Sequence, residues 1–239
     1  MPPLDRDHQI VLSVARFGQL TSGHLADMHF SDLASPTPLK RAVIRLVASK
    51  HLAIIERRPT GGTGAGSGQR VLQLGSAGWT FARREGRYWP YRTINLHTLA
   101  IVDAYVELTR LERLGRIRID GFSTEPDSWF NIAGADIRPD ITVDVSGSFP
   151  MKSIRLWIEI DMGTERQKAI KDKLERYWYG YVKADNGELD DIENLQVLFI
   201  APDDARAREL RWIIERGDKD AQALFMVSKL SEFAGLMFG

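Results

Sequence analysis

Three carboxylates at two places in the sequence have the types and spacing of metal ligands. Asp140 follows Pro139 at the head of an apolar stretch, and Glu159 and Asp161 close another, in the run LWIEID. On an extended strand, residues two apart point to the same face, so Glu159 and Asp161 would place two like charges side by side. This pattern is typical of a shared cation, of a carboxyl with a raised pKa, or of a solvated strand end paired with cations such as Arg166.

Carboxylate oxygens are the ligands that Mg²⁺ and Mn²⁺ prefer. A bound Mg²⁺ polarises a phosphodiester and lowers the pKa of an attacking water, which is the chemistry of DNA cleavage. We therefore predict that Asp140, Glu159 and Asp161 are metal ligands and catalytic residues.

The elements around these acids predict a mixed sheet with helices. The second and third expected strands would form an antiparallel pair, which brings Asp140 toward Glu159 and Asp161. Glu107 or Glu112, on the preceding helix, could point back to the same place. The expected elements are helices at 94–115, 164–184 and 203–216, and strands at 116–122, 136–145, 153–161, 195–202 and 223–228.

This order of elements and acids resembles the PD-(D/E)XK nuclease-like fold. The resemblance implies a Glu-x-Lys element, but Asp161 stands in the lysine position of this chain. In some relatives the lysine moves to the next helix, which implies Lys173 as the catalytic cation, with Lys171 as the second candidate. Thr164 and Gln167 fit a capping box that would start this helix.

The first ninety residues predict a winged helix-turn-helix that binds double-stranded DNA. The run GGTGAGSG predicts the tip of a hairpin, the wing. A strand follows it, and the chain has no Gly-Lys-Ser/Thr, so no nucleotide site is expected. A solvated basic helix face is the alternative to a DNA-reading one. The expected elements are helices at 5–18, 21–30 and 35–52 and strands at 53–58 and 70–75. The predicted DNA contacts are Thr37, Lys40, Arg41, Arg45, Arg57, Arg58 and Arg70.

The net charge of zero conceals an uneven distribution along the 239 residues. Residues 1–92 carry 13 Lys and Arg against 6 Asp and Glu, a net charge of +7, and the remainder carries 19 against 26, a net charge of −7. A basic front half suits phosphate and an acidic back half suits a cation. The absence of cysteine excludes disulfides, thiolate catalysis and cysteine-bound zinc. No apolar run could span a bilayer and no signal-peptide pattern is present, so we expect a cytoplasmic protein.

Several motifs together resemble the replication-relaxation family of plasmids, phages and other mobile elements. They are RFGQLTSGHLADMHF, TPLKRAVIRLVASKHL, LGSAGW and RPD…IEIDMGTE…KLERY. The resemblance implies an α+β chain with a winged-helix domain at 1–91 and a PD-(D/E)XK nuclease-like domain at 92–239. It also implies a role in plasmid replication or relaxation of supercoiled DNA.

We expect double-stranded DNA as the partner, Mg²⁺ or Mn²⁺ as the cofactor, and a homodimer on a repeated site. No membrane partner is expected. The alternative is a non-catalytic winged-helix regulator of transcription or replication, whose C-terminal domain serves dimerisation or partner binding.

Overall fold

A computed structural model describes residues 5–55, 69–147, 153–184 and 194–233 of the chain. The predicted glycine-rich tip, with Arg57 and Arg58, lies outside the described residues. The chain divides into two compact units, Met1–Val106 and Glu107–Gly239. The described residues contain no helix that is long and apolar enough to cross a membrane.

The division falls inside helix α5, Leu96–Arg113, and not at the sequence-based boundary between residues 91 and 92. The first half of α5 packs with the front unit, because Leu99 joins a core cluster with Ile55 and Val71. Asp103 also accepts a hydrogen bond of 2.8 Å from Nε2 of buried His24. These contacts join distant parts of the chain, so the local pattern around residue 91 did not indicate them.

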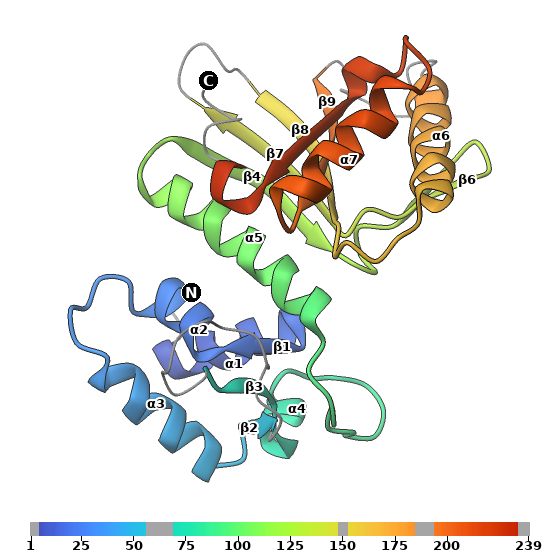
Figure 1. The fold of residues 1–239 in the computed structure, drawn as a ribbon. Helices are drawn as coiled ribbons and strands as arrows, with labels where there is room; N and C mark the ends of the chain where they lie inside the picture. Colours follow the sequence, from blue (N-terminus) through green and yellow to red (C-terminus); the bar gives the residue numbers. More distant parts are fainter. Residues whose placement is uncertain (1–4, 56–68, 148–152, 185–193, 234–239) are drawn as a thin grey trace. The chain divides into compact units, whose positions relative to one another are not determined.

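The front unit combines short helices with a small antiparallel sheet (Figure 1). Its strand order is β1-β3-β2, and β3 pairs with both neighbours in antiparallel register. The elements are α1 Arg6–Phe17, β1 Gln19–Thr21, α2 Ser22–His29, α3 Thr37–Ala48, β2 Leu52–Ile55, β3 Val71–Leu74 and α4 Ser76–Phe81. The predicted helices and strands are present, whereas β1 and α4 are too short for their period to be read from the sequence.

Local signals set the boundaries of these helices. The side chain of Asp5 accepts a hydrogen bond from the backbone N–H of His8 at the start of α1, and Gly18, with φ of 81°, ends that helix. Thr21 and His24 form a reciprocal capping box at the start of α2. On α3, Ala42, Val43 and Leu46 are buried, and the charged face is turned outward.

The back unit is a five-stranded mixed sheet in the order β10-β9-β8-β7-β4 (Figure 1). Strands β4, β7 and β8 are antiparallel, and β8, β9 and β10 are parallel. Helices α6 and α7 share one core cluster with β8 and β9, centred on Trp157 and Phe199. The elements are β4 Ile117–Thr124, β5 Phe130–Ile132, β6 Ala135–Ile137, β7 Ile141–Gly147, β8 Ser153–Ile160, α6 Gln167–Lys183, β9 Leu195–Ala201, α7 Asp204–Glu215 and β10 Phe225–Lys229. The mixed α+β class is therefore as predicted.

Two local predictions in this unit are wrong. The strand expected at 136–145 is two strands, β6 and β7, because Pro139 cannot donate to a ladder and interrupts the run. The capping box of Thr164 and Gln167 does not form, since α6 begins at Gln167 with Arg166 as its N-cap and no side-chain cap. The chain between β8 and α6 is instead organised by Asp161, as described below.

Candidate metal and DNA sites

Asp140 and Glu159 lie opposite each other at neighbouring strand ends. Strands β7 and β8 pair with Ile141 opposite Ile158, so the residues next in register, Asp140 and Glu159, face each other. Oδ2 of Asp140 accepts a hydrogen bond of 2.7 Å from the backbone N–H of Ile160. Both carboxylates are buried, and Glu159 is only 4% exposed. The hairpin therefore brings together two of the three predicted acids.

Glu159 is held by two side chains from α6. Nζ of Lys173 lies 2.8 Å from its Oε2, and the hydroxyl of Tyr177 donates to its Oε1. Lys173 also contacts Oε1 of Glu165 at 3.1 Å. Burial raises the pKa of Glu159 to about 7; the charge of Lys173 opposes this rise and that of Asp140 adds to it. Lys173, predicted as the displaced catalytic lysine, thus reaches the strand end.

Asp161 belongs to a different cluster. Arg206 on α7 binds its carboxylate through Nε at 3.1 Å and through a terminal nitrogen at 2.8 Å, and this ion pair is buried. The backbone N–H of Gly163 donates to the same carboxylate at 2.5 Å. In the described part of the chain, the oxygens of Asp140, Glu159 and Asp161 do not form a group within 4.8 Å of one another.

Glu125 is an acid that the sequence did not single out. One of its carboxylate oxygens lies within 4.8 Å of one of Asp140. Its backbone N–H donates to the carbonyl of Asp140 at 3.1 Å, and buried Ser128 donates to the carbonyl of Pro139 at 2.6 Å. These bonds fix the turn after β4 beside the start of β7. Nothing in the local sequence distinguishes Glu125 from other exposed acids.

The two helix acids considered from sequence are engaged elsewhere. Glu107 pairs with Arg110 on the same helix at 2.6 Å. Glu112 accepts a hydrogen bond of 2.8 Å from the backbone N–H of Ile119. Neither of these contacts brings Glu107 or Glu112 to Asp140 or Glu159.

By the same measure Glu125, Asp140 and Glu159 do not form a group within 4.8 Å among the described residues, but their carboxylates are of the chemical type that binds a hard divalent cation. Carboxylate oxygens with remaining positions filled by water are the usual environment of Mg²⁺ in proteins. A cation would also relieve the repulsion from Asp140 that contributes to the raised pKa of Glu159. Lys173 now supplies part of that compensation, so a cation would compete with it for Glu159.

The predicted DNA contacts differ in their surroundings. Thr37, Lys40 and Arg41 are exposed on α3, and Arg70 is exposed just before β3. Arg45 instead forms a two-point ion pair with Asp7 of α1, at 2.7 and 2.6 Å. The structure thus leaves part of the predicted α3 face open and engages Arg45 within the unit.

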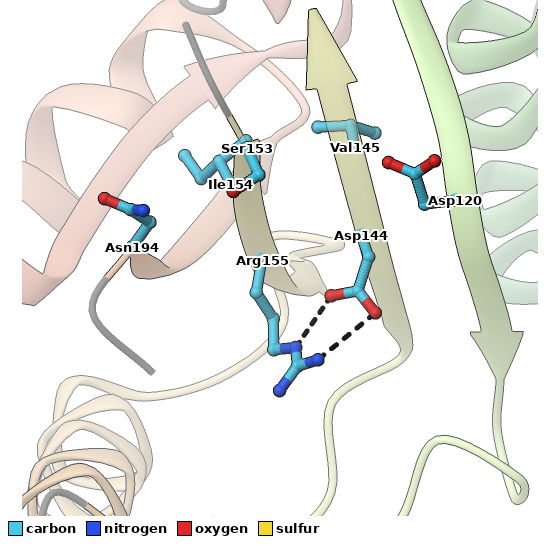
Figure 2. Close-up of a pocket in the computed structure, with 7 residues that line it drawn as sticks. All are labelled: Asp120, Asp144, Val145, Ser153, Ile154, Arg155 and Asn194. Atoms are coloured by element: carbon cyan, nitrogen blue, oxygen red, sulfur yellow. Dashed lines mark hydrogen bonds and ion pairs between the residues drawn. The ribbon is translucent and has the colours of Figure 1, made fainter. Parts of the chain in front are cut away.

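A polar pocket lies farther along the same strands, away from these acids (Figure 2). Asp144 of β7 and Arg155 of β8 are opposite in register and form an ion pair at 2.7 Å. Figure 2 shows Asp120 beside this pair without a dashed contact to it. Each acid of this pocket has its own arginine, Arg155 for Asp144 and Arg118 for Asp120, whereas Glu159 and Asp140 lie together beside Lys173, so this pocket is the weaker candidate.

Fold and site together define a mixed α+β protein whose front unit carries exposed basic side chains and whose back unit carries buried acids beside a lysine. The replication-relaxation family model matches residues 12–187. The chain belongs to this family, as its sequence motifs predicted. The match extends from α1 through α6 and includes Asp140, Glu159, Asp161 and Lys173, but not Arg206. No curated protein and no solved structure matches the chain.

Proposed function

We propose that the protein binds double-stranded DNA of a mobile element and nicks it with the help of Mg²⁺ during replication or relaxation. The observation that carries the proposal is the convergence of Asp140 and Glu159 at the adjoining ends of β7 and β8 with Lys173, which reaches Glu159 from within α6. Two acids at strand ends beside a lysine from the helix are the groups that a PD-(D/E)XK site with a displaced lysine would use. Membership of the replication-relaxation family supports the same role.

The front unit supports DNA binding by a winged helix. Its order of elements, α1-β1-α2-α3-β2-β3, places three helices before a hairpin, as expected for that architecture. In this proposal α3 enters the major groove, with Lys40 and Arg41 contacting phosphates or guanine edges. Binding as a homodimer to a repeated site is part of the proposal.

Each residue of the back-unit cluster has its own role in the proposed reaction. Asp140 and Glu159 hold the ion, with Glu125 close enough to Asp140 to take part, and Lys173 offsets charge on the phosphate. When bound, the ion polarises the phosphodiester and activates water. We assign Asp161 to structure instead of metal binding, because Arg206 already occupies its carboxylate.

A non-catalytic regulator is the second candidate, and one observation favours it. Both oxygens of Glu159 already have partners within the protein, Lys173 and Tyr177. A carboxylate whose two oxygens are both paired within the protein could stabilise the fold without binding a metal. The back unit would then act in dimerisation or in binding a partner protein.

A plasmid-nicking assay tests the proposal. Supercoiled plasmid carrying the replication region of the element is incubated with the protein and Mg²⁺ or Mn²⁺. We expect nicking that falls by at least about a hundredfold in Asp140→Asn, Glu159→Gln and Lys173→Met, since each removes part of the stabilisation of the transition state. The matched control is Asp144→Asn, on the same strand, which should retain activity.

The two candidates predict different results. Binding of the plasmid without nicking in either metal would favour the regulator. Nicking that survives both Asp140→Asn and Glu159→Gln would show that the cluster is not the catalytic site. In gel-shift titrations, Lys40→Ala and Arg41→Ala should weaken duplex binding and reduce its dependence on salt.

A further inference from the structure

The segment that joins α4 to α5, residues 82–95, is an irregular strap that is fixed to the front unit (Figure 1). A terminal nitrogen of Arg84 donates to the carbonyl of Ala15 on α1. The hydroxyl of Tyr88 donates to the carbonyl of Leu74 at 3.1 Å. The strap is thus anchored to both α1 and β3 although it forms no regular structure of its own.

Two buried glutamines extend this anchoring along the strap. Gln73 donates to the carbonyl of Tyr91 at 3.0 Å and accepts from its N–H at 2.6 Å. Gln19, its cross-strand neighbour, donates to the carbonyl of Thr93 at 3.0 Å and accepts from the N–H of Asn95 at 2.9 Å. Each glutamine side chain therefore donates one hydrogen bond to the backbone of the strap and accepts one from it, as the backbone of a neighbouring β-strand would. A segment held this firmly presents its outer side chains in defined positions.

The outer side chains of the strap are large aromatic rings. Trp89 is 65% exposed and Tyr91 is 57% exposed. Tyr91 rests against Gly18, where an added Cβ would lie 3.2 Å from the tyrosine oxygen. The guanidinium of Arg92 lies 5.7 Å from the centre of the Trp89 ring. Exposed aromatic rings on a fixed segment are a feature of binding surfaces. Because these rings are not buried, they do not stabilise the hydrophobic core of the unit.

The charge around these rings is positive. The strap contains four arginines and one acid, Glu85, and three of the arginines, Arg83, Arg87 and Arg92, are exposed without an ion pair among the described residues. A surface on which arginines flank exposed aromatic rings matches a chain of phosphates and bases. A purely apolar protein partner would have to desolvate these charges without compensation.

We propose that the strap binds single-stranded nucleic acid, with bases stacking on Trp89 and Tyr91 and phosphates contacting Arg87 and Arg92. Unpaired nucleotides are required, since the base faces in a duplex are covered by neighbouring base pairs. The surface is separate from the proposed duplex contacts of α3. It would allow the protein to hold a strand that is exposed when DNA is opened.

The test is a fluorescence anisotropy titration of the full chain with a labelled twelve-nucleotide DNA strand, the RNA of the same sequence, and the DNA duplex. Stacking on an aromatic side chain is worth about 1–3 kcal/mol per base. Trp89→Ala should therefore weaken single-strand binding by about tenfold and leave duplex binding within about twofold. The DNA and RNA arms show which strand the site prefers.

Three variants distinguish stacking on the Trp89 ring from a nonspecific apolar contact. Trp89→Phe should retain most of the affinity and Trp89→Leu should lose it, since leucine keeps apolar area but has no ring face. The matched control is Trp212→Ala in the back unit, which removes another exposed tryptophan that lies 4.1 Å from an arginine, Arg216. It should leave single-strand affinity unchanged.

Unchanged single-strand affinity in Trp89→Ala, or full affinity in Trp89→Leu, would overturn the proposal. An equal loss of single-strand and duplex affinity would overturn it as well, because it would indicate phosphate contacts without stacking. Thermal unfolding of each variant checks that the fold is kept. Duplex binding through α3 and nicking at Glu159 are measured separately, so failure here leaves the proposed function standing.

Discussion

The carboxyl of Glu159 takes up and releases its proton within the physiological pH range. Its pKa of about 7 arises first from burial, with the negative charge of Asp140 adding to the rise and Lys173 opposing it. Part of the carboxyl population is therefore protonated near neutral pH, where an ordinary glutamate is fully ionised. A divalent ion needs the ionised carboxylate, so protons and metal compete for the same group. Metal binding should strengthen as the pH rises through 7.

Glu159→Gln should change the pH dependence of stability. The pKa of Glu159 in the folded protein is above its ordinary value of 4.5, so the folded protein binds the proton more tightly than the unfolded chain. The resulting stabilisation is complete below about pH 4.5 and is lost as the pH rises through about 7. The loss amounts to about 3 kcal/mol of unfolding free energy. Glutamine cannot titrate, so urea denaturation at pH 5 and pH 8 should show a smaller difference in the variant.

The control for this prediction is Glu165→Gln. Glu165 contacts the same lysine, Lys173, but is much more exposed than Glu159. Its variant should keep the wild-type pH dependence. If Glu159→Gln and the wild type lose the same stability between pH 5 and pH 8, the carboxyl at 159 does not titrate in this range.

At the scale of elements, Arg206 joins the end of β8 to the starts of α6 and α7. Besides Asp161, it donates to the carbonyl of Glu165 at 2.9 Å and to Glu209 at 2.8 Å. The N-cap side chain of Asp203 accepts from the backbone N–H of Arg206 at 2.8 Å, which fixes this arginine in the first turn of α7. The junction sets the path from β8 to α6, and α6 carries Lys173 to Glu159.

Asp161→Asn should therefore destabilise the protein without removing the proposed metal site. It leaves a buried guanidinium with weaker compensation, which costs about 3 kcal/mol of unfolding free energy. The double variant Asp161→Asn with Arg206→Met should recover part of this loss, because the unpaired charge is gone. Chemical denaturation with and without Mg²⁺ measures both effects. A small loss of stability together with a complete loss of stabilisation by Mg²⁺ would make Asp161 a metal ligand after all.

The sequence predicted contacts that follow from one hairpin or one helix, and missed those that depend on packing. Alternation along β8 and an antiparallel partner were sufficient to predict that Asp140 lies near Glu159. Helical geometry was sufficient to consider Lys173. The pairing of Asp161 with Arg206 depends on how α7 packs near the end of β8, and no local pattern records this. Glu125 was missed for the same reason, since its place depends on a turn without a periodic signal.

At the scale of the whole molecule, charge and structure divide along similar lines. The net charge of +7 belongs to residues 1–92, and the remainder carries −7. The two compact units meet in sequence at Val106, so each charge excess lies largely within one unit. The charge pattern favours two units, and it does not record that the first half of α5 packs with the front one. Each unit has its own buried residues and its own proposed ligand, so we expect ligand effects on stability to be local.

Hydrogen exchange of the full chain can test this expectation. A ligand that binds only the folded state at a hundred times its dissociation constant stabilises it by about 2.7 kcal/mol, which slows exchange through global opening by about a hundredfold. Mg²⁺ should therefore slow exchange in β7, β8 and α6 and leave α1 to α3 unchanged, whereas duplex DNA should do the reverse. Glu159→Gln should remove the first effect alone, and Lys40→Ala with Arg41→Ala should reduce the second alone. Protection by Mg²⁺ in α1 to α3 at the same level as in β8 would mean that the two units respond as one, because a stabilising effect confined to one unit cannot slow the opening of an independent one.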